Sequence, residues 1–168
     1  MATQGGSRTR RLPKSQSEIP SATGLRDAAI EAGQCFETAI VTVFQAVPVL
    51  LREILHGLSW RIHEAQGARE VAQFLSEHRA PVILCHCSFA DGDWRDLVEC
   101  ISGLPSPPRL VVTSELADEF LWAEVLNLGG YDVIVQPFRE SEVIRILTSA
   151  IWQWAEESRR RNRPTRAK

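Results

Sequence analysis

The sequence lacks three features, and each absence narrows what the chain can be. It has no run of about 18 consecutive apolar residues, so no membrane-spanning helix is expected. It has no Cys-x-x-Cys pair and nothing typical of a secretory signal, so its four cysteines are expected to be reduced thiols in a cytoplasmic protein. It also has no lysine between Lys14 and Lys168, so arginine is the only strongly basic residue in the body of the chain.

Length and charge distribution predict one acidic domain between two tails. The 168 residues are 44% hydrophobic, which is enough for a single domain with its own core. Residues 35–157 hold eight Arg against 18 Asp or Glu, whereas six of the last ten residues are basic. We therefore predict a disordered tail over 1–35, a domain over 36–157 and a basic disordered tail over 158–168. The acidic domain argues against nucleic-acid binding, and no DNA-binding domain is expected.

Hydrophobic patterning predicts strands and helices in alternation. Short β-branched, apolar runs predict strands over 39–44, 60–65, 82–87, 110–113 and 131–135. Apolar residues at helical spacing predict helices over 47–58, 68–78, 93–101, 118–128 and 140–157, with Asp93 and Asp118 as N-caps. Five such units predict an α/β protein with a flavodoxin-like, doubly wound, five-stranded parallel sheet in the order 2-1-3-4-5. No glycine-rich loop follows the first strand, which disfavours a nucleotide enzyme.

The third predicted strand ends at Cys85-His86-Cys87, just before a polar loop. In an open α/β fold, chemistry sits beyond the carboxyl ends of central strands, so His86 is the first candidate functional residue. Side chains alternate along a strand, which places Cys85 and Cys87 on one face and His86 on the other. This divergence argues against a shared metal ion and against a thiol activated by His86. We interpret both cysteines as small core residues.

Three stretches carry a resemblance to a known family. They are 47–52 (VPVLLR) at the start of the first helix, 91–93 (DGD) before the third helix, and 128–138 (LGGYDVIVQPF) around the fifth strand. Over about residues 38–157 the chain resembles the receiver domain of bacterial response regulators, whose fifth strand leads into Lys-Pro-Phe. The resemblance implies a stand-alone module of two-component, or phosphorelay, signalling.

The resemblance also implies five chemical positions at the strand ends, and four of them are changed here. The phosphorylated aspartate falls on His86, the acidic pair that holds Mg²⁺ falls on Gln45 and Ala46, and the lysine falls on Gln136. Only the hydroxyl position is retained, as Ser114. Each change removes charge or nucleophilicity on which phosphoryl transfer depends.

The changes are mutually consistent, because they remove charges of both signs together. We expect Gln45 and Gln136 to face each other as neutral hydrogen-bonding groups. Val133 stands where the family has an aromatic switch residue. The interpretation is a receiver fold that has lost its switch chemistry, which is not an enzyme, needs no cofactor and has no Mg²⁺ site.

Extra apolar residues on the last two helices suggest where such a module would act. Trp122 and Leu126 lie beside the core stripe of the fourth helix, and Ile144 and Trp152 extend beyond that of the fifth. Receivers use this region for partners, so we predict an interaction surface here. The expected partner is a histidine kinase, another regulator or a second copy in a homodimer.

The sequence is compatible with two alternative functions. His86 could make the chain an atypical receiver that is switched by pH, by a metal ion or by phosphorylation. Alternatively, Ser114, His86 and Asp91 could share the rim of a small-molecule site on a flavodoxin-like domain.

Overall fold

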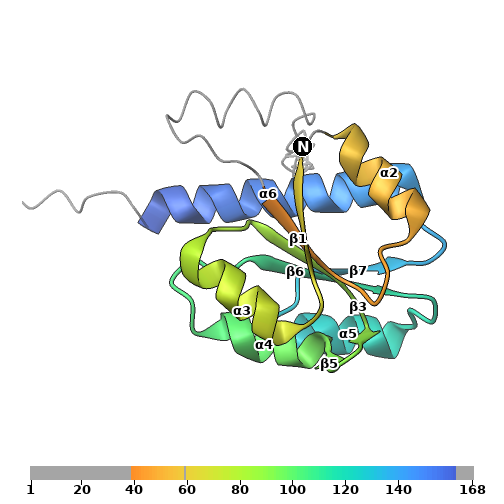
Figure 1. Ribbon diagram of the computed structural model, residues 1–168, viewed down its shortest axis with the longest axis horizontal. Coiled ribbons are helices and arrows are strands. Elements are labelled where there is room, and N and C mark those ends of the chain that lie inside the picture. Colours follow the sequence, from red (N-terminus) through yellow and green to blue (C-terminus); the bar gives the residue numbers. More distant parts are fainter. Residues whose placement is uncertain (1–38, 59, 162–168) are drawn as a thin grey trace, which may run out of the picture.

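A parallel sheet lies at the centre of the computed structural model, which describes residues 39–58 and 60–161 (Figure 1). Its strands are β1 (Ala39–Val43), β2 (Arg61–Ala65), β3 (Val82–His86), β6 (Arg109–Ser114) and β7 (Asp132–Val135). They stand in the order β2-β1-β3-β6-β7, and every neighbouring pair is parallel. Since β6 and β7 are the fourth and fifth strands of this sheet along the chain, the predicted order 2-1-3-4-5 is confirmed.

Helices cover both faces of the sheet. They are α2 (Val49–Gly57), α3 (Ala68–Glu77), α4 (Trp94–Ser102), α5 (Glu119–Asn127) and α6 (Glu140–Arg161). In Figure 1, α2 and α6 lie on one face, whereas α3, α4 and α5 lie on the other. This is the doubly wound arrangement that the alternation of strands and helices predicts.

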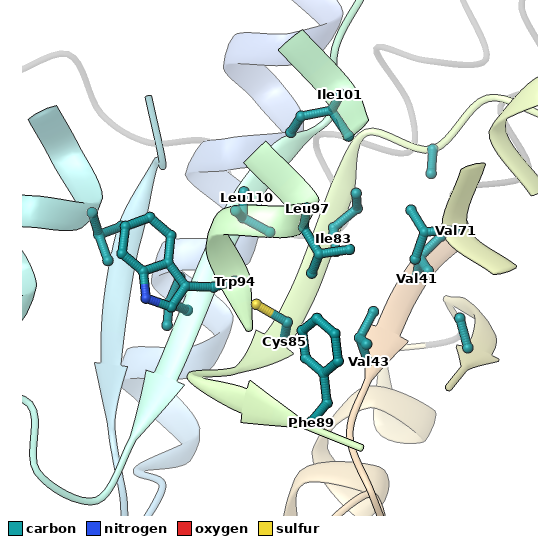
Figure 2. Packing of buried hydrophobic residues seen from close by; sticks show 14 of the residues in the cluster. Val41, Val43, Val71, Ile83, Cys85, Phe89, Trp94, Leu97, Ile101 and Leu110 are labelled. Atoms are coloured by element: carbon teal, nitrogen blue, oxygen red, sulfur yellow. The ribbon is translucent and has the colours of Figure 1, made fainter. Parts of the chain in front are cut away.

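Each face of the sheet has its own hydrophobic core. Figure 2 shows the core under α3 and α4, where Trp94 and Leu97 of α4 pack with Cys85 of β3. On the opposite face, Leu51 of α2 and Leu147 of α6 pack over the sheet. The first four residues of β3 are fully buried, as expected for the central strand of a sheet covered on both sides.

The start of α4 is fixed by a reciprocal pair of hydrogen bonds. Asp93 Oδ1 accepts from the backbone N–H of Arg95 at 2.7 Å, and Asp96 Oδ2 accepts from the backbone N–H of Asp93 at 2.8 Å. Asp118 likewise caps α5 by accepting from the N–H of Leu121 at 2.8 Å. Both predicted N-caps are thus confirmed, because each carboxylate satisfies an N–H that has no partner inside the helix.

Replacing Asp93 with alanine is expected to lower the free energy of unfolding by about 0.5–2 kcal/mol, the usual cost of losing an N-cap. The Asp93 side chain accepts from both the backbone N–H and the guanidinium of Arg95, so the variant loses both hydrogen bonds. Urea unfolding followed by far-UV circular dichroism measures the loss. Glu99→Ala, at an exposed site on the same helix, is the matched control and should change stability by less than about 0.5 kcal/mol. Equal losses in both variants would contradict the capping role.

Two parts of the predicted layout are wrong. The stretch expected to be a plain polar loop contains a small antiparallel hairpin of β4 (Ser88–Phe89) and β5 (Gly92–Asp93). The last helix continues to Arg161 instead of ending near Glu157, so residues 158–161 are helical and do not belong to a disordered tail. The rest of the predicted tails, 1–35 and 162–168, lies outside the described residues. None of the described helices is both long and apolar enough to cross a membrane.

Candidate functional site

The carboxyl ends of four adjacent strands bring the predicted chemical positions to one edge of the sheet. His86 is the last residue of β3, Ser114 is the last residue of β6, and Gln136 follows β7 directly. Gln45 and Ala46 form an exposed bend just after β1. Because these strands are parallel neighbours, all five residues lie along the same edge of the sheet. The chemical roles assigned to them remain predictions.

The ring of His86 is half-buried and is held by the backbone that follows it. Its Nδ1 lies 2.9 Å from the carbonyl oxygen of Ser88 and 3.3 Å from the backbone nitrogen of Ser88. The ring of Phe44 packs beside it, with 6.3 Å between the ring centroids. The shorter contact is that of an Nδ1–H donor, and a proton on Nδ1 leaves Nε2 as the acceptor of the neutral ring.

Cys87 packs against the same hydrophobic cluster as Cys85, on the side of the sheet that strand alternation predicts, although it lies just beyond the end of β3. β3 ends at His86, the chain bends at Cys87, and the Sγ of Cys87 comes within 3.7 Å of His86 Nδ1. Cys85 is fully buried in the core, as predicted. The two cysteines therefore share one face as predicted, and the difference is that the strand stops one residue earlier than expected, which lets the Cys87 thiol come near the His86 ring.

Gln136 is bonded to the sheet and not to Gln45. Its Nε2 donates to Thr113 Oγ1 at 3.4 Å, and Thr113 is fully buried and paired in register with His86. Gln45 is exposed, and no hydrogen bond joins the two glutamines within the part of the chain that the structure describes. The expected pairing of the two amides is therefore not formed.

The hydroxyl of Ser114 is used in a local turn. Its Oγ accepts from the backbone N–H of Leu116 at 3.1 Å, and Ser114 is buried. Asp91, at the tip of the hairpin, packs against Gly67, where an added Cβ would come 2.0 Å from Asp91 Oδ1. Over residues 39–58 and 60–161, no hydrogen bond links Ser114, His86 and Asp91. The polar groups proposed for a small-molecule rim therefore do not converge.

Several of the solved structures that this chain resembles are receiver domains. No protein-family model matches the chain, and no curated protein is similar enough in sequence to match. The receiver domain of a sensor histidine kinase from Pseudomonas aeruginosa PAO1, with magnesium coordinated in its active-site cleft, has a TM-score of 0.59 and 20% identity; the match covers 68% of this chain and 98% of that one. The chain has the receiver fold.

Two further structures have the same receiver fold. The signal receiver domain of an HD domain-containing protein from Pseudomonas fluorescens Pf-5 has a TM-score of 0.61 and 20% identity, covering 70% of this chain and 97% of that one. A CheY-like receiver domain protein from Methanospirillum hungatei JF-1 has a TM-score of 0.61 and 15% identity, covering 71% and 98%. Identities of this size establish the shared fold alone.

The side chains at the edge do not fit the Mg²⁺ that a receiver binds. Mg²⁺ requires oxygen ligands, mainly carboxylates, whereas the positions predicted to correspond carry the amide of Gln45, the methyl group of Ala46 and the imidazole of His86. The carboxylates that follow His86 in sequence belong to the hairpin, where Asp93 caps α4. Among the described residues, no group of three or more His, Cys, Asp or Glu side chains could hold a metal ion.

The predicted interaction residues differ in exposure. Trp122 of α5 is 50% exposed and Trp152 of α6 is 42% exposed, and Leu126 is also exposed. Ile144 is half-buried and packs against the core beneath α6, so it contributes less surface than predicted. The indole of Trp122 donates to Asp132 of β7 at 3.1 Å, which connects α5 to the edge strand.

Patterning alone missed several exposed apolar side chains near this surface. Phe120 is 85% exposed on α5. Leu116, in the turn after β6, and Val135, the last residue of β7, are also exposed. Of the α5 side chains only Val125 is fully buried. A surface helix that is apolar on several sides is unusual for a monomer. The mean hydropathy of residues 119–127 could have indicated these exposed apolar side chains from the sequence.

Proposed function

We propose that the chain is a receiver-like signalling module that works without phosphorylation and acts by binding another protein. Its partner would be a histidine kinase, another regulator or a second copy of the chain. The observation that carries the proposal is the chemistry of the carboxyl edge, where His86, Gln45, Ala46 and Gln136 offer neither a carboxylate nor a lysine.

Electrostatics explains why this edge is unsuited to phosphoryl transfer. The transferred group carries negative charge that a receiver offsets with a metal ion and a lysine, and catalysis depends on that compensation. Here Gln136 is neutral and bonded to Thr113, and the Ser114 hydroxyl accepts a backbone N–H. A phosphoryl group on His86 would therefore meet no cation from these positions.

The proposal that the chain binds another protein is supported by the α5–β7–α6 face, which is defined by Trp122, Leu126, Val135 and Trp152. All four apolar side chains are exposed, and they come from elements that meet at the β7 edge of the sheet. Covering them would remove apolar area from water, which is the main favourable term in protein association. Aromatic residues of this kind are enriched in protein interfaces.

Incubation with acetyl phosphate and Mg²⁺ is expected to leave the intact mass of the protein unchanged. The reason is the missing carboxylates and lysine around His86. Intact-protein mass spectrometry measures the outcome, and a conventional receiver treated in parallel shows that the reagents work. A stoichiometric gain of about 80 Da, one phosphoryl group, would sink the proposal.

The variant His86→Ala separates this proposal from a switch at His86. If the module acts by contact alone, the affinity for its partner should be nearly unchanged, because His86 lies at the strand end and not on the α5–β7–α6 face. A change in affinity of tenfold or more, about 1.4 kcal/mol, would favour the switch.

A further inference from the structure

The most exposed large apolar side chains that the structure describes lie where β6 leads into α5. They are Leu116 and Phe120, each 85% exposed. Both belong to residues 115–120 (ELADEF), called here the 115–120 segment, in which only Ala117 is partly buried and the others are exposed. The α5–β7–α6 face does not include this segment. Apolar side chains that stand together in water mark a surface that another molecule can cover.

The charge of the 115–120 segment indicates what kind of molecule would cover it. The segment holds three acidic residues, Glu115, Asp118 and Glu119, and no basic residue. Asp118 is used as the N-cap of α5. No ion pair joins Glu115 or Glu119 to another residue within the described part of the chain. Exposed apolar side chains flanked by unpaired carboxylates favour a partner surface that is basic.

The C-terminal end of α6 is a surface of this basic kind. Residues 159–161 are three exposed arginines in its last turn. No ion pair joins Arg160 or Arg161 to any residue that the structure describes. In the sequence, six of the residues 159–168 are basic and none is acidic. The end of α6 is therefore complementary in charge to the 115–120 segment.

The two complementary surfaces lie at opposite ends of one molecule. Glu157, near the end of α6, is paired with Arg109, the first residue of β6. Glu115 follows the last residue of the same strand, so it is about 20 Å from Arg109 at about 3.3 Å per residue. Beyond Glu157, α6 continues past the sheet (Figure 1). The arginines of its last turn therefore cannot reach the 115–120 segment of their own chain, and only a second molecule can make the contact.

We propose that the C-terminal end of α6 binds the 115–120 segment of a second copy of this chain. The guanidinium groups of Arg160 and Arg161 pair with the carboxylates of the segment. The aliphatic stems and planar groups of the arginines cover Leu116 and Phe120, since arginine packs on apolar surface through its stem and stacks on aromatic rings. Each copy carries both surfaces, so the contact is heterologous and one copy can bind two others.

This contact does not rest on the proposed function, because neither of its surfaces belongs to the α5–β7–α6 face. Phosphorylation by acetyl phosphate would overturn the proposed function and leave this contact standing. Sedimentation velocity of the full-length protein over a range of concentrations measures the contact. We expect association at an ionic strength of about 0.1 M, where charges act over about 10 Å. Association should be at least about tenfold weaker at about 1 M, where they act over about 3 Å.

Two charge-reversed variants test which surfaces meet. The double variant Glu115→Arg/Glu119→Arg makes the 115–120 segment basic, so it repels the end of α6. The double variant Arg160→Glu/Arg161→Glu reverses the charge at the end of α6, so it repels the unchanged segment. Each variant alone should associate at least about tenfold more weakly than the wild type. An equimolar mixture of the two should associate again, because each contact between the two variants joins opposite charges.

Glu77→Arg/Glu99→Arg is the matched control for the segment variant. Its two sites are exposed on α3 and α4, so it makes the same change in net charge elsewhere and should associate like the wild type. Far-UV circular dichroism shows whether each variant is folded, and recovery in the mixture shows that both surfaces are intact. The proposal is overturned if the wild type stays monomeric at every concentration at about 0.1 M ionic strength. It is equally overturned if either reversal leaves association unchanged, if the control loses it as well, or if the mixture does not recover it.

Discussion

Replacing Trp94 with alanine is expected to lower the free energy of unfolding by about 3–5 kcal/mol. Trp94 is the first residue of α4 and is only 1% exposed, which makes it one of the largest fully buried side chains of the protein. Figure 2 shows its indole in the core beside Cys85, where α4 meets β3. Truncation would remove the whole ring from this packing and leave a cavity that the surrounding strands can only partly close.

Urea unfolding followed by far-UV circular dichroism measures this loss without depending on tryptophan fluorescence. Trp152→Ala is the matched control, because Trp152 is 42% exposed on α6 and should cost less than about 1 kcal/mol. If the two variants were equally destabilised, the core beneath α4 would contribute far less to the free energy of unfolding than the burial of Trp94 indicates. A variant of Trp94 that is fully unfolded in buffer would agree with the prediction, since typical domain stability is only about 5–15 kcal/mol.

Local sequence patterns were enough to predict the sheet and its helices. The apolar run 82–85 predicts a strand that is buried on both sides, and a strand of this kind lies centrally only when helices cover both faces. The carboxylates of Asp93 and Asp118 predict helix starts because their hydrogen bonds span only two or three residues. Interactions of such short range are encoded locally, so single-sequence reasoning finds them.

The errors lie where the outcome depends on contacts between segments. The strands β4 and β5 have two residues each, which is too short for any periodicity to reveal. The bend at Cys87 accompanies that hairpin, so the end of β3 at His86 and the contact between the Cys87 thiol and the His86 ring were not predicted. The extension of α6 to Arg161 has no apolar period to predict it, and its last turn consists of three arginines.

The location of the candidate site was predictable, but the contacts of its side chains were not. Parallel strands share a carboxyl edge, so the ends of β1, β3, β6 and β7 gather once the strand order is known. The partners of the side chains at that edge were not predictable. Gln136 is hydrogen-bonded to Thr113 on the adjacent strand, and His86 contacts the backbone of Ser88. Both contacts depend on the strand register and on the hairpin, which the sequence pattern does not reveal.

Placing a charge on the α5–β7–α6 face is expected to weaken partner binding by tenfold or more, with little change in stability. The variant is Trp122→Arg. It removes a half-exposed indole and can still donate a hydrogen bond to Asp132, the group that Trp122 now contacts. Tryptophan at the centre of an interface commonly contributes 2 kcal/mol or more, about 30-fold in affinity, and a desolvated charge in its place adds a further cost. Unfolding stability should change by less than about 1 kcal/mol.

Val49→Arg provides the matched control for this face. Val49 is 73% exposed on α2, so the control makes the same change from apolar to basic at a site outside the α5–β7–α6 face. Sedimentation velocity measures self-association of the wild type and both variants, and direct titration measures binding to a histidine kinase or regulator. Loss of binding in Trp122→Arg alone would locate the interface on this face. Equal affinities for Trp122→Arg and the wild type would move it elsewhere, since an aromatic anchor cannot be exchanged for a charge inside an interface without cost.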